Sequence, residues 1–525
     1  MSQHYAIEMR GITKTFGSVV ANDNVELNVR PGEILALLGE NGSGKTTLMN
    51  MLSGIYKPDS GSIFVDGKQV TINSPEDAKK LGIGMVHQHF KLVDVFSAAD
   101  NIWMGREKPG LLLKKDRYAQ IEEISQKFGF EIDPRKKVYN MAVSEKQTLE
   151  IVKVLYYGAK VIILDEPTAV LTVQEIEKLF KVLRRMKEDG HSIIIITHKL
   201  NEVMEISDRV AILRKGAYIT TVDTAQTNEQ ALTEWMVGRK VDLNIDRPVM
   251  ETSRPLLEVR NLTIRNDEGA TAINDVSFYI RGGEILGVAG IAGCGQKELC
   301  EAIAGLRPIE KGQMIHKGDN IVGLPPRKIL EKGISMSFIP EDRLGMGLAP
   351  SLSITDNMIL KSYADTKGPF VDRKVGRADA EQVIQELGVV TPSTETPVRR
   401  LSGGNVQKVL LGREIKSKPN VIITAYPVRG LDINSSYAIY NILNQQKTAG
   451  VGVLFVGEDL DVMMALCDKI MVLCHGKVMG VVHAHKTTKE ELGLMMTGAL
   501  DLSNKYEDKP AGFARDTRFG ESEEA

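Results

Sequence analysis

The feature that most constrains this chain is a glycine-rich loop that occurs twice. The first copy spans 39–47 and reads Gly-Glu-Asn-Gly-Ser-Gly-Lys-Thr-Thr, and the second spans 290–297 and reads Gly-Ile-Ala-Gly-Cys-Gly-Gln-Lys. Matching segments lie 251 residues apart at this loop (39 and 290) and 260 apart later (141 and 401, 165 and 425). The sequence therefore predicts two copies of one domain, the second with a longer middle insertion.

The length and the breaks in pattern predict where these domains lie. A chain of 525 residues is too long for a single hydrophobic core. We expect a first domain over 5–240, a linker over 241–255, where Pro248 and Pro255 interrupt the periodic patterns, and a second domain over 256–498. The tail, 501–525, lacks apolar periodicity, which favours disorder.

Composition argues against several classes of protein. Lys and Arg number 66 against 68 Asp and Glu, so the net charge of -2 gives no electrostatic reason to expect a nucleic-acid partner. The four cysteines lack metal-ligand spacing, which fits reduced thiols in a cytosolic protein. The longest aliphatic runs, such as 193–196, are only as long as a strand. We therefore expect any role at a membrane to come through a partner.

The first loop has the context that triphosphate binding requires. An apolar strand pattern over 34–38 precedes it, and helical spacing resumes over 48–52. Glycines let the backbone wrap phosphates, a lysine supplies charge to the outer phosphates, and a threonine hydroxyl binds Mg²⁺. We therefore expect ATP to contact Gly39, Asn41, Gly42, Ser43, Gly44, Lys45, Thr46 and Thr47, with Thr46 also a ligand of Mg²⁺.

Polar residues follow two further apolar strand patterns. Asp165 and Glu166 come directly after 161–164. We expect Asp165 to bind Mg²⁺ and Glu166 to act as the base that polarises water. His198 follows 193–197, and although a lone histidine after a strand is more often structural, the surrounding motifs favour a role at the γ-phosphate.

Gln88 and Phe16 complete the first set of candidates. Gln88 follows the apolar stretch 83–86 and lies between His87 and His89. A metal site built on the two histidines is disfavoured because no third ligand is near, so we interpret Gln88 as a relay residue that also reaches Mg²⁺. Phe16 precedes the loop and either stacks on adenine or packs in the core.

With these motifs in order, and with Asp165-Glu166-Pro167-Thr168 and Leu401-Ser402-Gly403-Gly404-Asn405, the chain resembles an ABC-transporter ATPase from residue 5 to about 498. The resemblance implies an α/β fold of two tandem P-loop NTPase domains. Each domain would have a mainly parallel core sheet, an antiparallel β subdomain and a helical subdomain. It also implies that two cassettes clasp head to tail, with each ATP between the phosphate loop of one and the Leu-Ser-Gly-Gly signature of the other. Nucleotide contacts are then expected at Ser402, Gly403, Gly404 and Asp432.

The departures from the family's motifs are unevenly distributed. At the places of Lys45, Thr46, Asp165, Glu166 and His198, the second copy has Gln296, Lys297, Ala425, Tyr426 and Glu458. Asp267 lies at or near the place of Phe16, and the first copy's own signature segment, 141–145, reads Met-Ala-Val-Ser-Glu. In a head-to-tail clasp these losses fall on one interface. The sequence therefore predicts one competent ATP site, because random decay would not spare the other side.

Two details make the chain most similar to fused ATPases of sugar and nucleoside importers, and within them to the nucleoside branch. The importer class is indicated by Ile339-Pro340-Glu341-Asp342-Arg343 in place of Gln88 and by Gly295-Gln296 in the second loop. The nucleoside branch is indicated by Gln296 in place of lysine together with Ala425 in place of the aspartate that ends the strand. The resemblance implies a peripheral ATPase at the cytoplasmic face of the membrane that works with two permeases and, through them, an extracellular binding protein or lipoprotein. Alternatives are import of a ribose- or galactose-type sugar, or of a ribosyl or ribityl vitamin.

Two interpretations remain open at this stage. The segment 90–96 is apolar enough to receive a permease helix, and burial inside the domain is the equal alternative for Leu92, Val93 and Phe96. A soluble tandem ATPase acting on ribosomes or DNA is less favoured. Those that act on ribosomes usually have a long, basic helical linker and two competent sites, and this chain has neither.

Overall fold

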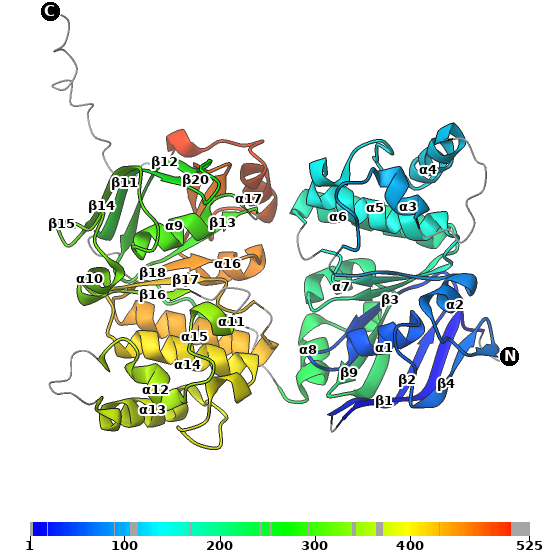
Figure 1. Ribbon diagram of the computed structural model, residues 1–525, viewed down its shortest axis with the longest axis horizontal. Coiled ribbons are helices and arrows are strands. Elements are labelled where there is room, and N and C mark those ends of the chain that lie inside the picture. The colour runs from blue at the N-terminus through cyan, green and yellow to red at the C-terminus, as the bar shows by residue number, and fades with distance from the viewer. Residues whose placement is uncertain are drawn as a thin grey trace, which may run out of the picture. The chain divides into compact units, whose positions relative to one another are not determined.

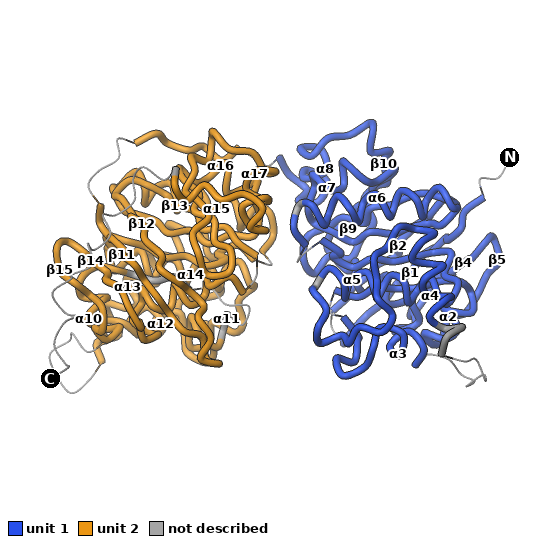
Figure 2. The backbone as a smooth tube through the Cα atoms, turned by 90° about the horizontal axis from the view of Figure 1, so that it is seen from above, with its two compact units in different colours: residues 1–243 blue, residues 244–525 orange. Residues whose placement is uncertain are grey.

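The computed structural model divides into two compact units, residues 1–243 and 244–525 (Figure 2). It describes residues 4–17, 19–88, 90–104, 114–168, 171–240, 244–250, 255–291, 293–338, 343–363, 371–429 and 431–505. Among the described helices, none combines the length and the apolar character needed to cross a bilayer.

The core of the first unit is a parallel sheet in the order β6-β7-β8-β3-β9, with β10 antiparallel at the side of β9. Every residue of β3, β7 and β8 is buried, as expected for aliphatic strands covered by helices on both faces. The strands are β3 (Ile34–Leu38), β6 (Ile83–Val86), β7 (Val161–Asp165), β8 (Ser192–Ile196), β9 (Arg209–Arg214) and β10 (Ala217–Asp223).

An antiparallel subdomain continues this sheet through a single pairing between β2 and β10. Its order is β2-β1-β4-β5, and its strands are β1 (Ile7–Phe16), β2 (Val19–Val29), β4 (Ser60–Val65) and β5 (Lys68–Val70). Alternate residues of β1 such as Ile7 and Met9 are fully buried. The subdomain therefore packs one face on the core.

The helices of the first unit fall into two groups (Figure 1). A helical subdomain is formed by α3 (Ala98–Trp103), α4 (Lys114–Phe128) and α5 (Val143–Tyr156), which share a hydrophobic cluster that includes Ile102, Ile121 and Leu149. The remaining helices are α1 (Lys45–Leu52), α2 (Pro75–Lys80), α6 (Val173–Glu188), α7 (Leu200–Ile206) and α8 (Glu229–Val237).

The second unit repeats this plan, which confirms the predicted fold class. Its core sheet has the order β16-β17-β18-β13-β19-β20, parallel except for β20, and its antiparallel sheet has the order β12-β11-β14-β15. The strands are β11 (Pro255–Arg265), β12 (Thr271–Arg281), β13 (Ile285–Gly290), β14 (Lys311–His316), β15 (Asp319–Asn320), β16 (Ile334–Phe338), β17 (Val421–Ala425), β18 (Gly452–Val456), β19 (Lys469–Cys474) and β20 (Lys477–His483).

The helices of the second unit show where its extra residues lie. They are α9 (Gln296–Ile303), α10 (Pro326–Glu331), α11 (Arg343–Met346), α12 (Ile354–Ile359), α13 (Arg373–Leu387), α14 (Gly403–Lys416), α15 (Ile433–Thr448), α16 (Leu460–Leu466) and α17 (Lys489–Met496). The offset between the copies is still 251 at β6 and β16 and has become 256 at α3 and α12. More than half of the extra length therefore enters between β16 and α12, where α11 lies.

Two stretches outside the predicted domains are held on the second unit. Within 241–255, Asn444 Nδ2 donates to the Asp246 carbonyl (2.6 Å) and an Arg247 guanidinium N–H donates to the Cys467 carbonyl (2.7 Å). The expectation of disorder from 501 onward does not hold for 501–505. The Leu502 N–H donates to the Met479 carbonyl (2.6 Å), and Ser503–Lys505 form a 3₁₀ turn.

Candidate functional site

The first glycine-rich loop connects β3 to α1 and encloses a buried lysine. Gly42 and Gly44 have φ of 79° and 94°, and a Cβ on Gly44 would lie 2.2 Å from the Ala21 carbonyl oxygen, so only glycine fits there. Lys45, 7% exposed, donates from Nζ to the carbonyls of Gly39 (2.6 Å) and Glu40 (3.0 Å). The ammonium group therefore lies inside the loop that was predicted to hold phosphate.

Burial and nearby carboxylates act in opposite directions on Lys45. Burial lowers the pKa of its ammonium group, while Glu166 and Asp165 favour the charged form. In the same loop, the buried Ser43 Oγ has no hydrogen-bond partner among the described residues. Together the loop offers a positive charge and an unused hydroxyl, which suits a bound phosphate.

The acidic pair lies at the carboxyl end of β7, beside α1. Thr46 Oγ1, in the first turn of α1, is 3.5 Å from Asp165 Oδ2. Burial and the neighbouring Glu166 carboxylate raise the pKa of Asp165 to about 6. Hydroxyl and carboxylate oxygens are ligands that Mg²⁺ prefers, so Thr46 and Asp165 fit the metal site predicted for them.

Glu166 and His198 contact each other across neighbouring strands. Glu166 has a left-handed backbone (φ 48°), and its N–H donates to the Ile196 carbonyl (2.9 Å). Its Oε1 is 2.8 Å from His198 Nδ1, whereas its buried Oε2 has no partner among the described residues. One carboxylate oxygen is thus held by the histidine, and the other is free to accept a proton.

Gln88 and Phe16 lie at the ends of the strands that precede the site. β6 pairs in parallel with β7, so Gln88, two residues beyond β6, follows the same edge of the sheet as Asp165. Its side chain is exposed and forms no hydrogen bond with the described residues. Phe16 is 44% exposed and packs edge to face on Tyr56, with ring centroids 5.3 Å apart. The alternative of core packing for Phe16 is therefore wrong.

The alternative of a metal site at His87 gains no support from the described residues. Among them, no group of three His, Cys, Asp or Glu side chains is placed to hold a metal ion. His89, the other member of the pair, lies outside the described residues. Burial lowers the pKa of His87, with further contributions from Lys91 and Lys153.

Replacing Asp165 with Asn is expected to raise the melting temperature of the metal-free protein at pH 7.5. Burial lifts the folded-state pKa of Asp165 from 3.8 to about 6, so the ionised carboxylate costs stability above pH 6 and costs nothing below pH 4. The gain should be a few degrees, at about 2–4 °C per kcal/mol, and should vanish at pH 4. Thermal unfolding at both pH values tests this, and an equal difference at both would contradict it.

The second glycine-rich loop has the same backbone and different chemistry. α9 begins at Gln296 as α1 begins at Lys45, and the Gln296 side chain, 3% exposed, donates from Nε2 to the Ile291 carbonyl (3.3 Å). A neutral amide thus replaces the buried cation. Lys297 points to the surface and pairs with Glu301 (3.7 Å).

The acidic pair is also replaced at matching backbone positions. Ala425 ends β17, and Tyr426 has φ 52° and donates its N–H to the Val456 carbonyl (2.8 Å), as Glu166 does to Ile196. Burial raises the pKa of the Tyr426 phenol to about 12, so it is neutral at physiological pH. Glu458 pairs with Arg429 (3.4 Å). This edge of the second sheet therefore offers neither the metal ligand nor the base.

The signature segment of the second unit begins helix α14. Ser402 is the exposed N-cap and accepts a hydrogen bond from Asn405 Nδ2 (2.9 Å). Gly404 is buried, and a Cβ there would lie 2.5 Å from Ser435 Oγ. Asp432 caps α15, accepting from the Ser435 N–H (2.9 Å) and Oγ (2.7 Å). The predicted residues Ser402, Gly403, Gly404 and Asp432 therefore lie together at two helix N-termini.

The corresponding segment of the first unit carries a negative charge. α5 begins at Val143, and Glu145 accepts a hydrogen bond from the Ala142 N–H (2.7 Å) and pairs with Lys136 (2.7 Å). Glu145 occupies the place of the neutral Asn405. Lys136 balances the charge of Glu145, but the carboxylate already occupies this helix end and leaves less room there for a phosphate, an obstacle that sequence reasoning missed. A glutamate three residues beyond a helix N-cap was the signal that could have revealed it.

Comparisons with known proteins agree with this geometry. A family model described as ABC transporter matches residues 22–169 and 273–427. The chain is 43% identical to the guanosine import ATP-binding protein NupO of Bacillus subtilis, over 94% of this chain and 98% of the relative. It is 40% identical to the nucleoside import ATP-binding protein NupA of Lactococcus lactis (95% and 99%). It is also 38% identical to the ribose import ATP-binding protein RbsA 1 of Rubrobacter xylanophilus (94% and 98%).

A solved structure shares the two-unit fold. The chain matches a structure of an archaeal ribosome recycling factor, aABCE1, in complex with the ribosomal stalk protein aP1. The TM-score is 0.58, and the match covers 90% of both chains. The sequence identity is only 16%, so this likeness concerns the fold alone.

Proposed function

Since the chain belongs to the ABC transporter family of ATPases, we propose that it is the ATP-hydrolysing subunit of a membrane importer of nucleosides. The observation that carries this proposal is similarity along nearly the whole chain to import ATP-binding proteins whose names specify guanosine and nucleosides. Import of a ribose- or galactose-type sugar, or of a ribosyl or ribityl vitamin, is the alternative, and the similarity to a ribose import protein supports the first of these.

We infer one competent ATP site, made from the phosphate loop of the first unit and the signature of the second. Support comes from the distribution of chemistry within each unit. The first unit has a cation in its loop and a hydroxyl beside a carboxylate, whereas its signature helix has Glu145 in its first turn. The second unit has an uncharged signature at Ser402 and an amide, Gln296, in its loop. Each unit therefore supplies one half of the proposed ATP site.

Hydrolysis at this site would use groups that the first unit already positions. Lys45 and the glycine-rich backbone would hold the phosphates, and Thr46, Asp165 and Gln88 would bind Mg²⁺. When bound, Mg²⁺ neutralises negative charge on the phosphate oxygens. The proton of the attacking water would pass to Glu166 Oε2, while His198 Nδ1 holds Oε1 at 2.8 Å and fixes the carboxylate's orientation.

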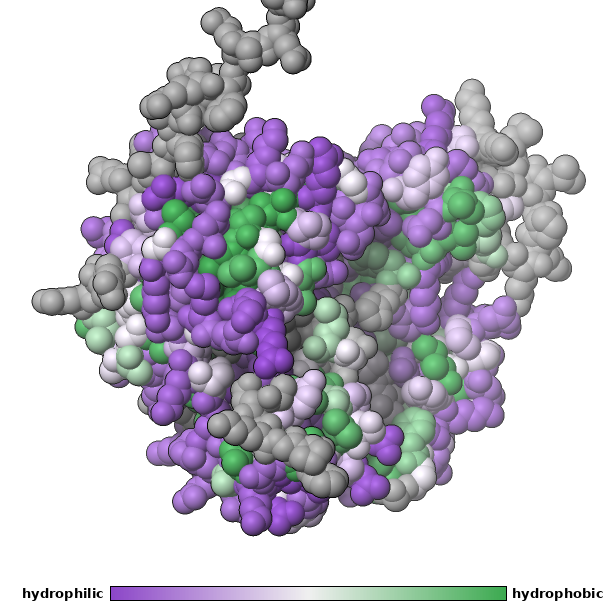
Figure 3. Space-filling view, turned by 60° about the vertical axis from the view of Figure 1, so that its left-hand side comes forward, coloured by the Kyte–Doolittle hydropathy of each residue, from purple (hydrophilic) through white to green (hydrophobic). Residues whose placement is uncertain are grey.

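The proposed partners are two transmembrane permeases, with an extracellular binding protein or lipoprotein acting through them, at the cytoplasmic face of the membrane. Surface chemistry supports contact with other proteins. The face shown in Figure 3 is largely hydrophilic, with hydrophobic residues gathered in a few patches. On the first unit, the exposed hydrophobic residues include Val93, Val95, Phe96 and Tyr139, in and beside the segment predicted to receive a permease helix.

Uptake measurements test the proposed substrate. The chain, expressed together with the permeases of a nucleoside importer, should support accumulation of labelled guanosine that unlabelled ribose does not reduce. The same cells carrying Glu166→Gln should show background uptake. Accumulation of labelled ribose, blocked by unlabelled ribose and not by guanosine, would contradict the nucleoside assignment and support the sugar alternative.

A further inference from the structure

Each unit presents a short surface segment that is fixed to the start of its signature region in the same way. In the first unit, the Val138 N–H donates to the Phe96 carbonyl (3.0 Å), and the Tyr139 N–H donates to the Asp94 carbonyl (3.1 Å). In the second, Val398 donates to Leu352 (3.1 Å) and Arg399 donates to Pro350 (3.0 Å). These matched hydrogen bonds allow the two surfaces to be compared position by position.

On the first unit this surface is mostly apolar, and we call it the first docking face. Val95 is 65% exposed, Phe96 37% and Tyr139 61%. The charge of Asp94 is countered by Lys146 at 3.2 Å, and one further positive charge comes from the exposed Lys137, whose Nζ donates to the Val95 carbonyl (3.2 Å). Large exposed hydrophobic groups on a rigid backbone favour a partner that buries apolar surface.

On the second unit the matching surface is basic, and we call it the second docking face. Leu352, 39% exposed, keeps an apolar group at the place of Phe96, while Ser351 replaces Val95 and Arg399 replaces Tyr139, with Arg400 next to it. Both arginines are exposed, and neither forms an ion pair or side-chain hydrogen bond with any described residue. Among the described residues, two positive charges therefore stand unpaired where the first unit presents a tyrosine and an asparagine.

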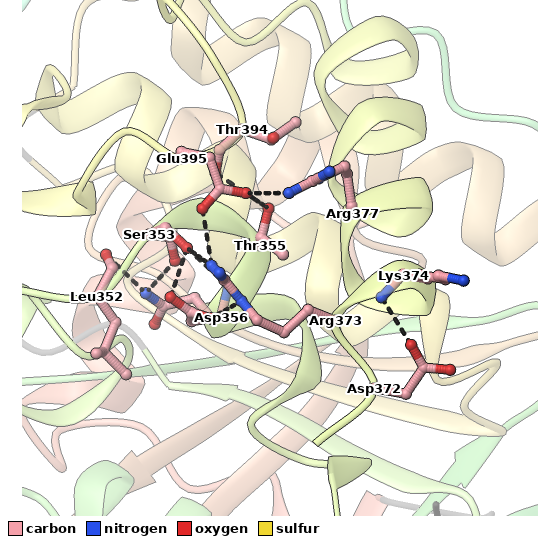
Figure 4. Close-up of polar contacts among 11 residues, drawn as sticks. Leu352, Ser353, Thr355, Asp356, Asp372, Arg373, Lys374, Arg377, Thr394 and Glu395 are labelled. Carbon is pink, nitrogen blue, oxygen red and sulfur yellow. Dashed lines mark hydrogen bonds and ion pairs between the residues drawn. The ribbon is translucent and has the colours of Figure 1, made fainter. Parts of the chain in front are cut away.

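The carboxylates nearby are already neutralised (Figure 4). Arg373 pairs with Asp356 (2.8 Å) and with Glu395 (2.7 Å), and Arg377 also pairs with Glu395 (3.2 Å). Thr355 Oγ1 donates to Glu395 at 3.2 Å. These contacts fix the loop that leads into 398–400, and they pair its carboxylates with arginines, so that the loop has no carboxylate left to neutralise Arg399 or Arg400. The second docking face therefore keeps a net positive charge from Arg399 and Arg400.

We propose that the second docking face binds a permease segment that presents carboxylates, whereas the first binds an apolar segment. This inference rests on the proposed function, which supplies the permeases, and it adds that their two contact segments are not interchangeable. Exposed guanidinium groups pair with carboxylates in a bidentate geometry, and a positive patch selects against a positive partner.

Zero-length cross-linking in the assembled complex tests the proposal. Arg399→Lys keeps the charge and provides an amine that a carbodiimide joins only to a carboxylate in direct contact. Tyr139→Lys is the matched control on the first docking face. Mass spectrometry should find residue 399 linked to an Asp or Glu of a permease, and residue 139 linked to none. The charge reversal Arg399→Glu should reduce co-purification with the permeases at least 10-fold and leave basal ATP hydrolysis unchanged.

The outcomes separate this inference from the function on which it rests. Co-purification with permeases without a link at residue 399, or with links at 139 as frequent as at 399, would overturn only the inference. The charge-reversed protein could instead lose binding to anionic vesicles that lack permeases and still co-purify with the permeases normally. That result would assign the arginines to lipid and would also overturn the inference. Failure to co-purify with any permease would overturn the proposed function itself.

Discussion

Replacing Glu166 with Gln should reduce steady-state ATP hydrolysis by about 10²–10⁴-fold, the usual contribution of a general base, while ATP still binds. The carboxylate carries one oxygen held by His198 at 2.8 Å and one buried oxygen without a partner among the described residues. An amide keeps the size of the side chain and cannot accept the proton. Phosphate release measures the loss of turnover, and equilibrium binding of labelled ATP measures what is retained.

The second unit provides a matched control for this variant. Tyr426 has the same left-handed backbone as Glu166 and the same hydrogen bond to the neighbouring strand. Tyr426→Phe should leave hydrolysis within about twofold of the unmodified chain, because its neutral phenol has no acid–base role in the proposed site. A Glu166→Gln protein that still hydrolyses ATP at the normal steady rate would rule out Glu166 as the base.

Replacing Lys45 with Gln should reduce hydrolysis at least 100-fold and weaken ATP binding as well. The change places in the first loop the residue that the second loop already has, and it removes the buried ammonium group that reaches the carbonyls of Gly39 and Glu40. Removing a positioned donor from developing negative charge costs about 10²–10³ in rate. Titration of labelled ATP, together with phosphate release, distinguishes lost binding from lost chemistry.

Placing a lysine in the second loop should not restore the ATP hydrolysis lost with Lys45. Adding Gln296→Lys to the Lys45→Gln protein gives the second loop a cation, yet Lys297, Ala425 and Tyr426 still replace the hydroxyl, the carboxylate and the base. Hydrolysis should therefore remain at background. Recovery of turnover in the double variant would show that the second loop can support catalysis.

Local patterns in the sequence predicted the first glycine-rich loop and the buried strands beside it, whereas the fold of the two domains and the roles of Ser402 and Asp432 came from the resemblance to ABC-transporter ATPases. Aliphatic runs that end in Asp165 and before His198 predicted buried parallel strands, and the structure places them at β7 and β8. The spacing of glycines predicted the loop between β3 and α1. These features depend on neighbours in the chain, so one sequence was enough to identify them.

Features that depend on tertiary contacts were not predicted. The edge-to-face contact of Phe16 with Tyr56 joins a strand end to a loop 40 residues later. The hydrogen bond from Asn444 on α15 to the Asp246 carbonyl was not predicted, because the sequence around Asp246 has no apolar periodicity. Each depends on which distant segments come together.

In the proposed site, the phosphate loop of the first unit works with the signature of the second. Ser402 and Ala142 are exposed N-cap residues of the two signature helices, so a bulky side chain at either should be tolerated by the fold. The most direct measurement is ATP hydrolysis by Ser402→Arg and by Ala142→Arg, compared with the unmodified chain. Ser402→Arg should lower the rate at least 100-fold and Ala142→Arg should leave it unchanged. The reverse pattern, or equal losses from both changes, would contradict the proposed pairing of the first phosphate loop with the second signature.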